Sequence, residues 1–442
     1  LLDRRDCTGA RRPRHAEAAV ITANAFRGKR YAVYGLARTG KAVIAALVAS
    51  GADVVAWDDK PAAREGCAVP LADLHDANLV GLDALVVSPG VPLRTHPLTQ
   101  RASAARVKII GDIELFAQAR AELPSHRVVG ITGTNGKSTT TALIHHLLQS
   151  AGIAARLGGN IGLPIMAQEP LPAGGVYVLE LSSYQLDLTF SLDCDVAVLL
   201  NITPDHLDRH GDMAGYAAAK ARLFAMQSDA HTAVIAAEDD YTRAVAASVS
   251  AKLVTVAAAD IGAEQADWPS LQGPHNAQNA AAAIAAVRAL GLTDAQIAAG
   301  LASYPGLEHR MERVREMNGV LFVNDSKATN PTSTAPALAA YPRIHWIAGG
   351  LAKTPELDAC LPQLGHVAAA YLIGEAAPVF AAILKPHVPV IEASTLEVAT
   401  RTAAAAARPG DTVLLSPACA SFDQFSDFEA RGRAFVSIVE SL

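Results

Sequence analysis

Short apolar runs that alternate with alanine- and leucine-rich stretches restrict this chain to a narrow set of folds. From residue 30 onward, β-branched runs are separated by segments of helical composition. Strands that alternate with helices of this length form βαβ units, and such units place their strands parallel in one sheet. Parallel strands are covered on both faces, so they read as continuous apolar runs. We therefore predict an α/β protein with mostly parallel sheets.

The expected strands recur along the whole chain. They are Arg30–Tyr34, Asp53–Trp57, Ala84–Val87, Arg127–Ile131, Val176–Leu179, Asp195–Leu200, Ala233–Ala236, Gly319–Val323, Ile344–Ala348 and Thr412–Leu415. Helices are expected between them, for example over Lys137–Ser150, Asn276–Leu290 and Leu396–Ala407. A chain of 442 residues exceeds what one hydrophobic core usually supports. We expect two or three domains, with seams near Gly111–Pro124 and Tyr304–Gly306.

Composition excludes several classes of protein. Hydrophobic residues make up 51% of the chain and charged residues 18%, which argues against general disorder. A net charge of −6 argues against a mainly electrostatic binder of nucleic acid. No apolar run is long enough to span a membrane. The five cysteines are far apart and form no CxxC or Cys/His cluster, so neither a disulfide framework nor structural zinc is suggested. We expect a soluble, intracellular protein.

The first residues differ from the rest of the chain. Residues 1–20 are rich in arginine, lack apolar periodicity and have no hydrophobic segment of the kind that a secretory signal needs. We expect a disordered extension over residues 1–26, with the native start at or near Val20.

The strongest local signal is a glycine-rich loop between an apolar strand and a helix. Gly130, Gly133 and Gly136 precede the triplet Lys137-Ser138-Thr139. Glycines let backbone N–H groups approach phosphate oxygens, and the helix N-terminus adds partial positive charge. The lysine reaches the outer phosphates, and a hydroxyl can serve Mg²⁺. The standard spacing requires glycine at position 131, where this chain has isoleucine, but the combined pattern still predicts nucleotide binding.

A weaker glycine turn lies in the first part of the chain. Gly35 and Gly40 flank a turn between a strand and a helix, and Asp58 and Asp59 end the next strand. This arrangement resembles a dinucleotide fingerprint in which the acidic residue holds a ribose hydroxyl, although the middle glycine is missing. The turn Ser88–Gly90 ends a third strand. An ordinary tight turn between a strand and a helix remains the alternative.

Further polar residues follow the expected strands. Glu180 ends one strand, and the next leads into Asn201–Asp208, which contains His206. Ligands gather at the carboxyl ends of strands in open α/β sheets, so both side chains are candidate metal ligands. His206 would be an unusual partner for Mg²⁺, which prefers oxygen. By composition alone, Lys220 reads as a lysine on a helix surface. In the last third, three strand ends carry cationic or hydroxyl groups, at Asp325–Pro331, Gly349–Lys353 and Ser416–Ser421, which suits an anionic substrate.

Taken together, these segments resemble the Mur ligases, and most closely the branch of that family that adds D-glutamate. The resemblance runs from about residue 28 to the end of the chain. Its most specific segments are GTNGKSTT, GGNIGLP, LELSSYQL, NITPDHLDRH, YAAAK, HNAQNAAAA, NDSKATN and LLSPACASFDQF, together with GDIELF at Gly111–Phe116.

The resemblance implies three domains, each α/β: a Rossmann-like UDP-binding domain at 27–111, a central ATP-binding domain of P-loop type at 112–306 and a Rossmann-like amino-acid-binding domain at 307–442. Residues implied to bind the uridine nucleotide are Gly35, Leu36, Thr39, Gly40, Asp58, Ser88 and Gly90. Residues implied to bind ATP are Gly133, Thr134, Asn135, Gly136, Lys137, Ser138, Thr139, Asn276, Asn279, Arg310 and Asp325. Residues implied to surround D-glutamate are Lys327, Thr329, Lys353, Ser421, Phe422 and Phe428. At Phe422 the family pattern leads us to expect leucine, which puts that contact in doubt.

The resemblance also implies the chemistry. Lys137, Asn160, His206 and Lys220 would be catalytic, with Lys220 carrying a carbamate derived from CO₂. Ser138, Glu180, His206 and the carbamate would hold Mg²⁺, in two sites. The implied reaction is the ATP-dependent addition of D-glutamate to UDP-N-acetylmuramoyl-L-alanine by a cytoplasmic monomer.

Three alternatives stay open from the sequence. One is a related ligase, either another Mur ligase or a folylpolyglutamate synthase. The second is a nicotinamide-dependent oxidoreductase that uses the turn between Gly35 and Gly40. The third is a non-catalytic regulator that binds a nucleotide.

Overall fold

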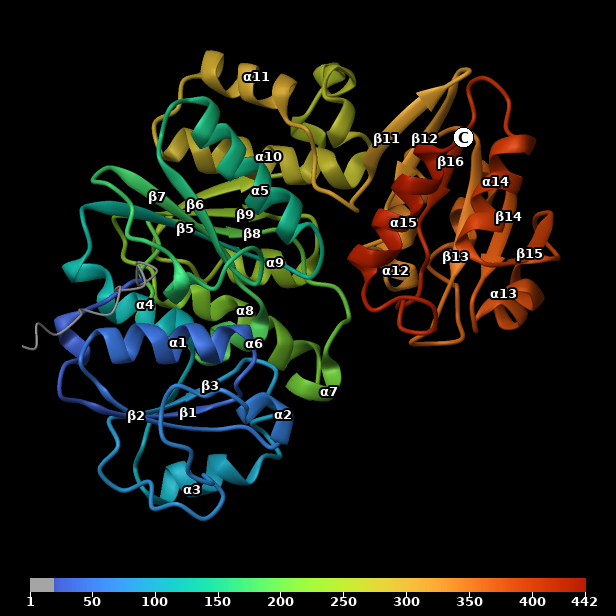
Figure 1. Ribbon diagram of the computed structural model, residues 1–442. Helices are drawn as coiled ribbons and strands as arrows, with labels where there is room; N and C mark the ends of the chain where they lie inside the picture. The colour runs from blue at the N-terminus through green and yellow to red at the C-terminus, as the bar shows by residue number, and fades with distance from the viewer. Residues whose placement is uncertain (1–19) are drawn as a thin grey trace, which may run out of the picture. The chain divides into compact units, whose positions relative to one another are not determined.

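The computed structural model describes residues 20–442, which form two compact units (Figure 1). The first unit contains the described chain up to Ser125 together with Leu163–Ala173. The second contains His126–Gly162 and Gly174–Leu442. One sheet lies in the first unit and two lie in the second, so the predicted α/β class is confirmed.

The first unit is a parallel sheet of four strands in the order β2-β1-β3-β4. Its strands are β1 (Arg30–Tyr34), β2 (Asp53–Trp57), β3 (Ala84–Val87) and β4 (Ile109–Ile110). Its helices are α1 (Arg38–Ala49), α2 (Pro61–Arg64), α3 (Pro97–Ala104) and α4 (Asp112–Ala119), with short 3₁₀ turns η1 (Asn24–Phe26), η2 (Arg120–Glu122) and η3 (Ile165–Ala167). Leu98 and Ala102 of α3 pack on Ala32 and Leu85, while α1 covers the other face (Figure 1). The sheet is therefore buried on both sides, as its continuous apolar strands require.

The limits of the first unit differ from the seams expected from the sequence. The unit extends past Gly111 because α4 packs against α1 and η3. At the other end, Ile21 and Phe26 are fully buried, and η1 is held by two backbone bonds to the carboxylate of Glu122. Residues 20–26 therefore belong to the fold and not to an extension. The expectation for residues 1–19 lies outside the described residues.

The central sheet of the second unit has six parallel strands in the order β10-β9-β8-β5-β7-β6. They are β5 (His126–Thr132), β6 (Ala155–Gly159), β7 (Gly175–Glu180), β8 (Val196–Leu199), β9 (Thr232–Ala236) and β10 (Lys252–Val256). The helices are α5 (Lys137–Ser150), α6 (Ser183–Asp187), α7 (Leu207–His210), α8 (Met213–Ala225), α9 (Asp240–Ala246), α10 (Pro274–Ala289) and α11 (Asp294–Ser303). A large apolar cluster joins α5, α10 and α11 to one face of this sheet. Because β5 lies between β7 and β8, the loop that follows β5 sits where the strand order reverses, the usual ligand position in open α/β sheets.

The last sheet has the order β11-β12-β16-β13-β14-β15. Its strands are β11 (Glu312–Met317), β12 (Val320–Asn324), β13 (Ile344–Gly349), β14 (Val367–Ile373), β15 (Val390–Ser394) and β16 (Thr412–Leu415), and only the β11–β12 pair is antiparallel. Its helices are α12 (Pro331–Leu338), α13 (Ala377–Leu384), α14 (Leu396–Ala406) and α15 (Phe428–Glu440). Helices α12 and α13 pack on one face of the sheet through one apolar cluster, and α14 and α15 pack on the opposite face through another. No helix within residues 20–442 is long and apolar enough to cross a bilayer.

Candidate active site

The glycine-rich loop is fixed by the strand beside it. The amide of Thr134 donates to the carbonyl of Asn201 at 2.8 Å, and the amide of Asn135 donates to the Asn201 side chain at 2.8 Å. Gly136 has φ of 82° and is the N-cap of α5, and a Cβ there would collide with the side chain of Asn279. Glycine is therefore required at position 136, both for its positive φ and for the space beside Asn279. The loop is a rigid turn at the start of a helix of fourteen residues, which is a suitable seat for phosphate.

Two lysine amines meet at this loop. The Nζ of Lys137 donates to the carbonyls of Gly133 at 2.9 Å and Thr134 at 2.8 Å. The Nζ of Lys220, on α8, donates to the same Gly133 carbonyl at 2.7 Å and lies 4.5 Å from the ring centre of Tyr216. Burial lowers the pKa of Lys137, with Glu180 opposing the shift and Arg310 adding to it. Lys220 is only 1% exposed, and burial together with Lys137 holds its pKa well below the usual range. Both effects shift Lys220 toward its neutral amine form.

Glu180 provides a buried oxygen that has no hydrogen-bond partner. It ends β7 and is 2% exposed. Its Oε1 accepts a bond of 2.9 Å from the amide of Asn160, whereas Oε2 has no partner. A Cβ at Gly159 would strike the Glu180 carbonyl, so glycine allows β6 to approach β7 this closely. An orphaned carboxylate oxygen is costly to bury unless a cation or donor meets it. This oxygen fits the expected role of Glu180 as a ligand of Mg²⁺.

His206 is held beside two aromatic rings in an unusual backbone conformation. Its φ is 53°, and it is the N-cap of α7. The hydroxyl of Tyr184 lies 2.9 Å from its Nδ1, and its Nε2 lies 3.4 Å from a carboxylate oxygen of Asp205. Burial lowers the pKa of His206, Asp205 opposes the shift, and Lys137 and Lys220 add to it. The imidazole is therefore neutral at neutral pH, the form that can bind a metal or accept a proton.

The residues expected around ATP come from three further segments. On α10, Asn279 accepts a bond from Thr140 at 3.3 Å and donates to Asn276 at 3.1 Å. The guanidinium of Arg310 donates to the hydroxyl of Ser138 at 3.2 Å. Asp325 accepts from Ser416 at 2.8 Å, and burial raises its pKa to about 7. The structure therefore brings Arg310 to the start of α5, whereas Asp325 bonds to Ser416 in the loop after the neighbouring strand β16.

The residues expected around the amino acid lie at the carboxyl ends of neighbouring strands. Asn324 of β12 pairs with Leu415 of β16, and Ile347 of β13 pairs with Leu415 from the other side. The loops that follow these strands therefore share one edge of the sheet, and they carry Asp325, Lys327, Thr329, Lys353 and Ser421.

Two aromatic residues at this edge differ in their contacts. The Nζ of Lys327 lies 3.7 Å from the ring centre of Phe428, and burial lowers the pKa of Lys327, with Arg310 adding to the shift. Phe422 is 69% exposed, although it is a large apolar side chain. Phe428 therefore has a defined cation partner, whereas the side chain of Phe422 is exposed to solvent.

The glycine turn of the first unit is built around Asp58. One carboxylate oxygen of Asp58 accepts the amide of Leu36 at 2.7 Å, and the other accepts the amide of Lys60 at 2.9 Å. The hydroxyl of Ser88 donates to the Gly35 carbonyl at 3.1 Å, and a Cβ at Gly40 would collide with that same carbonyl. Thr39 lies in the first turn of α1, and a Cβ at Gly90 would meet open space. All seven residues expected at the uridine nucleotide thus follow β1, β2 or β3 at one edge of the sheet.

Comparison with known proteins agrees with this geometry. Family models match residues 29–111 (Mur ligase MurD-like, N-terminal domain), 131–287 (Mur ligase middle domain) and 309–419 (Mur ligase, glutamate ligase domain). A UDP-N-acetylmuramoylalanine–D-glutamate ligase of Novosphingobium aromaticivorans is 61% identical over 96% of this chain and 97% of its own length. The chain belongs to the Mur ligase family. Ligases of the same name from Sphingopyxis alaskensis and Zymomonas mobilis are 58% and 55% identical, each over 96% of this chain and 100% of their own lengths.

Solved structures of Mur ligases share the fold at low sequence identity. UDP-N-acetylmuramate-alanine ligase MurC from Thermotoga maritima is 18% identical with a TM-score of 0.56, over 93% of this chain and 99% of that one. MurF from Acinetobacter baumannii is 19% identical with a TM-score of 0.58, over 95% and 93%. Escherichia coli FolC, solved with DHPP and ADP, is 20% identical with a TM-score of 0.54, over 75% and 93%. Membership of the Mur ligase family argues against the two alternatives of a nicotinamide-dependent oxidoreductase and a non-catalytic regulator.

Sequence analysis of this Mur ligase missed one residue that organises the amino-acid edge. Arg431 of α15 is 1% exposed, and its guanidinium donates to the Ser326 carbonyl at 2.9 Å, the Cys419 carbonyl at 3.0 Å and the Ala420 carbonyl at 3.2 Å. It therefore ties the loop after β12 to the loop after β16. In the sequence, Arg431 resembles the solvent-facing arginine that often occurs in a helix, and no local signal distinguishes it from Arg433.

Replacement of Arg431 by leucine is expected to lower the free energy of unfolding of the last sheet by about 3 kcal/mol. The variant leaves three loop carbonyls without their donor, and each unsatisfied buried group costs about 1–3 kcal/mol before relaxation. Denaturant unfolding followed by tryptophan fluorescence measures the change, since Trp346 lies in this sheet. Arg433→Leu on the exposed face of α15 is the matched control and should change stability little. Equal stability of the two variants would contradict the bracing role.

Proposed function

We propose that this chain is the ligase that joins D-glutamate to UDP-N-acetylmuramoyl-L-alanine, with ATP converted to ADP and phosphate, in peptidoglycan precursor synthesis. The observation that carries the proposal is the near full-length identity of 61% to a ligase of that name. The phosphate loop at the strand-order reversal, with Glu180 beside it, supports the same chemistry. Because the reaction consumes ATP and a soluble nucleotide sugar, we place it in the cytoplasm, with a monomer as the working form.

Each segment of the chain takes one reactant in this proposal. Residues 27–111 bind the uridine nucleotide with the turn after β1 and Asp58. Residues 112–306 bind ATP with the loop Gly133–Thr139 and the asparagines of α10. Residues 307–442 bind D-glutamate at the loops that carry Lys327, Thr329, Lys353 and Ser421, with Phe422 and Phe428 at its sides. The cations of this edge complement the two carboxylates of the amino acid.

The first chemical step activates the carboxylate of the nucleotide substrate. A carboxylate is a poor electrophile because oxide is a poor leaving group. Transfer of the γ-phosphoryl group of ATP to this carboxylate gives an acyl phosphate and ADP, and the new leaving group is phosphate. Two anions must approach for this step, and the ammonium of Lys137 together with the loop amides stabilises the charge that develops on the phosphates. Arg310 can swing from the Ser138 hydroxyl to the same phosphates, because it already lies within 3.2 Å of that residue.

The second step forms the amide bond. The amine of D-glutamate attacks the acyl carbon, passes through a tetrahedral intermediate and expels phosphate. The attacking amine must lose a proton, and the neutral imidazole of His206 can accept it or can orient the acyl group. Asn160, whose side chain bonds to Glu180 at 2.9 Å, can donate to the oxygen that gains charge. Exclusion of water from this step protects the acyl phosphate from hydrolysis.

The residues beside the phosphate loop fit Mg²⁺. The unpaired oxygen of Glu180, the hydroxyl of Ser138, the imidazole of His206 and a carbamate on Lys220 would hold the ion, in two sites. When bound, Mg²⁺ supplies positive charge to the phosphate oxygens. The lowered pKa of the buried Lys220 amine suits it to react with CO₂, because only the unprotonated amine is a nucleophile.

Phosphate release with a panel of amino acids tests the function. With ATP and UDP-N-acetylmuramoyl-L-alanine present, release should require D-glutamate and should not occur with L-glutamate, glycine or L-alanine. Release with a different amino acid would support the ligase reaction but would contradict the assignment of D-glutamate to the loops after β12, β13 and β16. No release with any amino acid would reject this nucleotide substrate in favour of another Mur ligase or a folylpolyglutamate synthase.

A further inference from the structure

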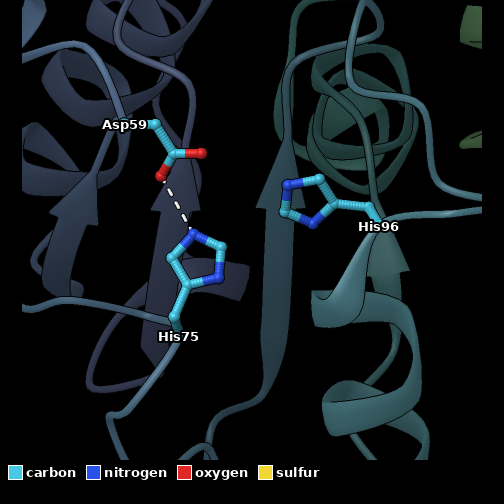
Figure 2. Close-up of side chains that lie close together, drawn as sticks. All are labelled: Asp59, His75 and His96. Carbon is cyan, nitrogen blue, oxygen red and sulfur yellow. Dashed lines mark hydrogen bonds and ion pairs between the residues drawn. The ribbon is translucent and has the colours of Figure 1, made fainter.

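Two histidines and one aspartate gather at the outer edge of the first unit. Asp59 follows β2, His75 lies in the loop between α2 and β3, and His96 is the N-cap of α3. One carboxylate oxygen and one nitrogen from each ring lie within 4.8 Å of one another, and Figure 2 shows the ring of His75 below the carboxylate and the ring of His96 to its right. Among the described residues, this is the one group of three acidic, histidine or cysteine side chains with such spacing. The group lies at the carboxyl edge of this sheet, where Asp59 directly follows Asp58 of the turn that we assign to the uridine nucleotide, but none of its three side chains has a role in the proposed reaction.

The fold brings these three side chains together from distant positions. The segment before His75 is held along β2 by backbone bonds, in which Ala56 donates to Pro70 at 3.0 Å and accepts from Ala72 at 3.2 Å. His96 accepts the amide of Leu98 at its Nδ1, at 3.3 Å, so its Nε2 carries the proton. The separations in sequence explain why no metal-binding spacing was visible there.

Tyr34 connects the group into one network. Its hydroxyl donates to Asp59 Oδ2 at 2.6 Å and lies 3.0 Å from Nε2 of His96. The other oxygen of Asp59 lies 2.9 Å from Nε2 of His75. Both Nε2 atoms therefore face the same carboxylate, one directly and one through the phenol. Partners of this kind fix the orientation of ligands around metals in proteins.

We propose that Asp59, His75 and His96 form a binding site for one divalent transition-metal ion of the zinc class. Two imidazoles and one carboxylate are a donor set that zinc prefers, whereas Mg²⁺ prefers oxygen alone. The fourth position is left to water, because the Tyr34 phenol is neutral and serves as the partner of Asp59. The side chains of Asp59 and His75 are 57% and 33% exposed, so an ion can enter from solvent.

The geometry requires only local adjustment. Ligands about 2.1 Å from a tetrahedral ion lie about 3.4 Å from one another. The pair of Asp59 and His75 at 2.9 Å must open slightly, and the remaining pairs, at no more than 4.8 Å, must close by about 1 Å or a little more. Binding through Nε2 moves the ring proton of each histidine to Nδ1, so no net proton is released. A proton on Nδ1 of His96 breaks the hydrogen bond of 3.3 Å that this atom accepts from the amide of Leu98.

Titration of the full chain with Zn²⁺ alone tests the proposal. Untagged protein, with Mg²⁺ in excess to fill oxygen-rich sites, should bind one equivalent of Zn²⁺ by isothermal titration calorimetry. His75→Gln and His96→Asn should each weaken binding at least tenfold, because loss even of an outer partner costs about 10–100-fold in metal proteins. Asparagine at position 96 can still cap α3, so this variant keeps the helix start.

Controls separate this site from adventitious binding. His387→Gln removes an exposed histidine of the second unit and should leave the affinity unchanged. With Co²⁺ in place of Zn²⁺, the visible absorption of a four-coordinate ion should appear in the parent protein and vanish in His75→Gln. Equal Zn²⁺ affinity in the parent protein, His75→Gln and His96→Asn would overturn the site, as would the absence of a stoichiometric binding event. Unfolding temperatures of the metal-free variants establish that each is folded.

Discussion

Lys137→Ala is expected to lower ATP-dependent phosphate release by about 10³-fold or more. The variant removes the only side-chain cation of the loop itself, and the loss of one preorganised donor to developing charge typically costs 10²–10³-fold. The Lys137 ammonium faces both the polyphosphate and the substrate carboxylate, so its loss should lower the rate by at least this factor. Steady-state phosphate release with saturating UDP-N-acetylmuramoyl-L-alanine and D-glutamate measures the effect.

The structural cost of this substitution is expected to be small. Lys137 bonds to carbonyls of its own loop, Gly133 and Thr134, and the Gly133 carbonyl keeps its bond from Lys220 when the side chain is lost. The unfolding temperature should therefore change little. Lys252→Ala, which removes an exposed lysine from β10, is the matched control and should keep its activity. Near-normal turnover of Lys137→Ala would refute the phosphate assignment of the loop.

Strands in the centre of the sheets could be predicted from the sequence because burial shapes them directly. The predicted bounds of β1, β2, β3 and β16 agree with the structure, and β5, β7, β8, β9, β12 and β13 differ by one residue at one or both ends. These strands are buried on both faces, so their residues form the continuous apolar runs that mark parallel sheets. The pattern was sufficient for the fold class and for the position of the phosphate loop.

Apart from β2, the strands at the edges could not be predicted, and β14 was missed for a different reason. Lys252, Leu253 and Thr255 of β10 are exposed, and four of the six residues of β11 (Glu312–Met317) are charged, so neither forms the continuous apolar run of a buried strand. β6 ends in Gly158-Gly159, and glycine is depleted in strands and typical of turns. β14 contains Ala368, Ala369 and Ala370, and alanine favours helix unless neighbouring strands impose a different conformation. The return of Leu163–Ala173 to the first unit likewise depends on tertiary packing that no local signal reports.

In the candidate site, residues that are close in sequence could be predicted, whereas residues that act from distant parts of the chain could not. The loop residues from Gly133 to Ser138 are contiguous, and their spacing alone indicates phosphate. Asn201 braces that loop from 66 residues away, and its position at the end of β8 was the one available signal. Arg431 acts through loops that the sequence places far apart. Tyr184 of α6 contacts His206 through its hydroxyl, and no sequence pattern distinguishes this tyrosine from others. Sequence therefore indicates which groups touch ligands better than which groups hold them in place.

Lys220→Ala is expected to reduce turnover by about 10²–10³-fold, the range found when one stabilising group is removed from an active site. Added acetate or propionate should restore part of the activity, since a small carboxylate can enter the space left by the side chain and replace the carbamate oxygens. The parent protein and Lys252→Ala should not respond to either carboxylate. Unchanged activity of Lys220→Ala would reject the carbamate.

An independent readout distinguishes a carbamate from a plain amine. In the parent protein, carbon-13 bicarbonate should give a carbamate signal by NMR, and the signal should be absent from Lys220→Ala. The reaction joins the neutral Nζ to the carbon of CO₂, releases one proton to solvent and leaves an anionic carboxylate on a nitrogen that still bears one N–H. That N–H can keep the bond to the Gly133 carbonyl, now 2.7 Å long, while the new oxygens point away from it. Loss of activity without either carboxylate rescue or a carbamate signal would mean that Lys220 acts as an amine. Burial lowers the pKa of Lys220, and this shift favours the carbamate because it raises the fraction of the unprotonated nitrogen that CO₂ requires.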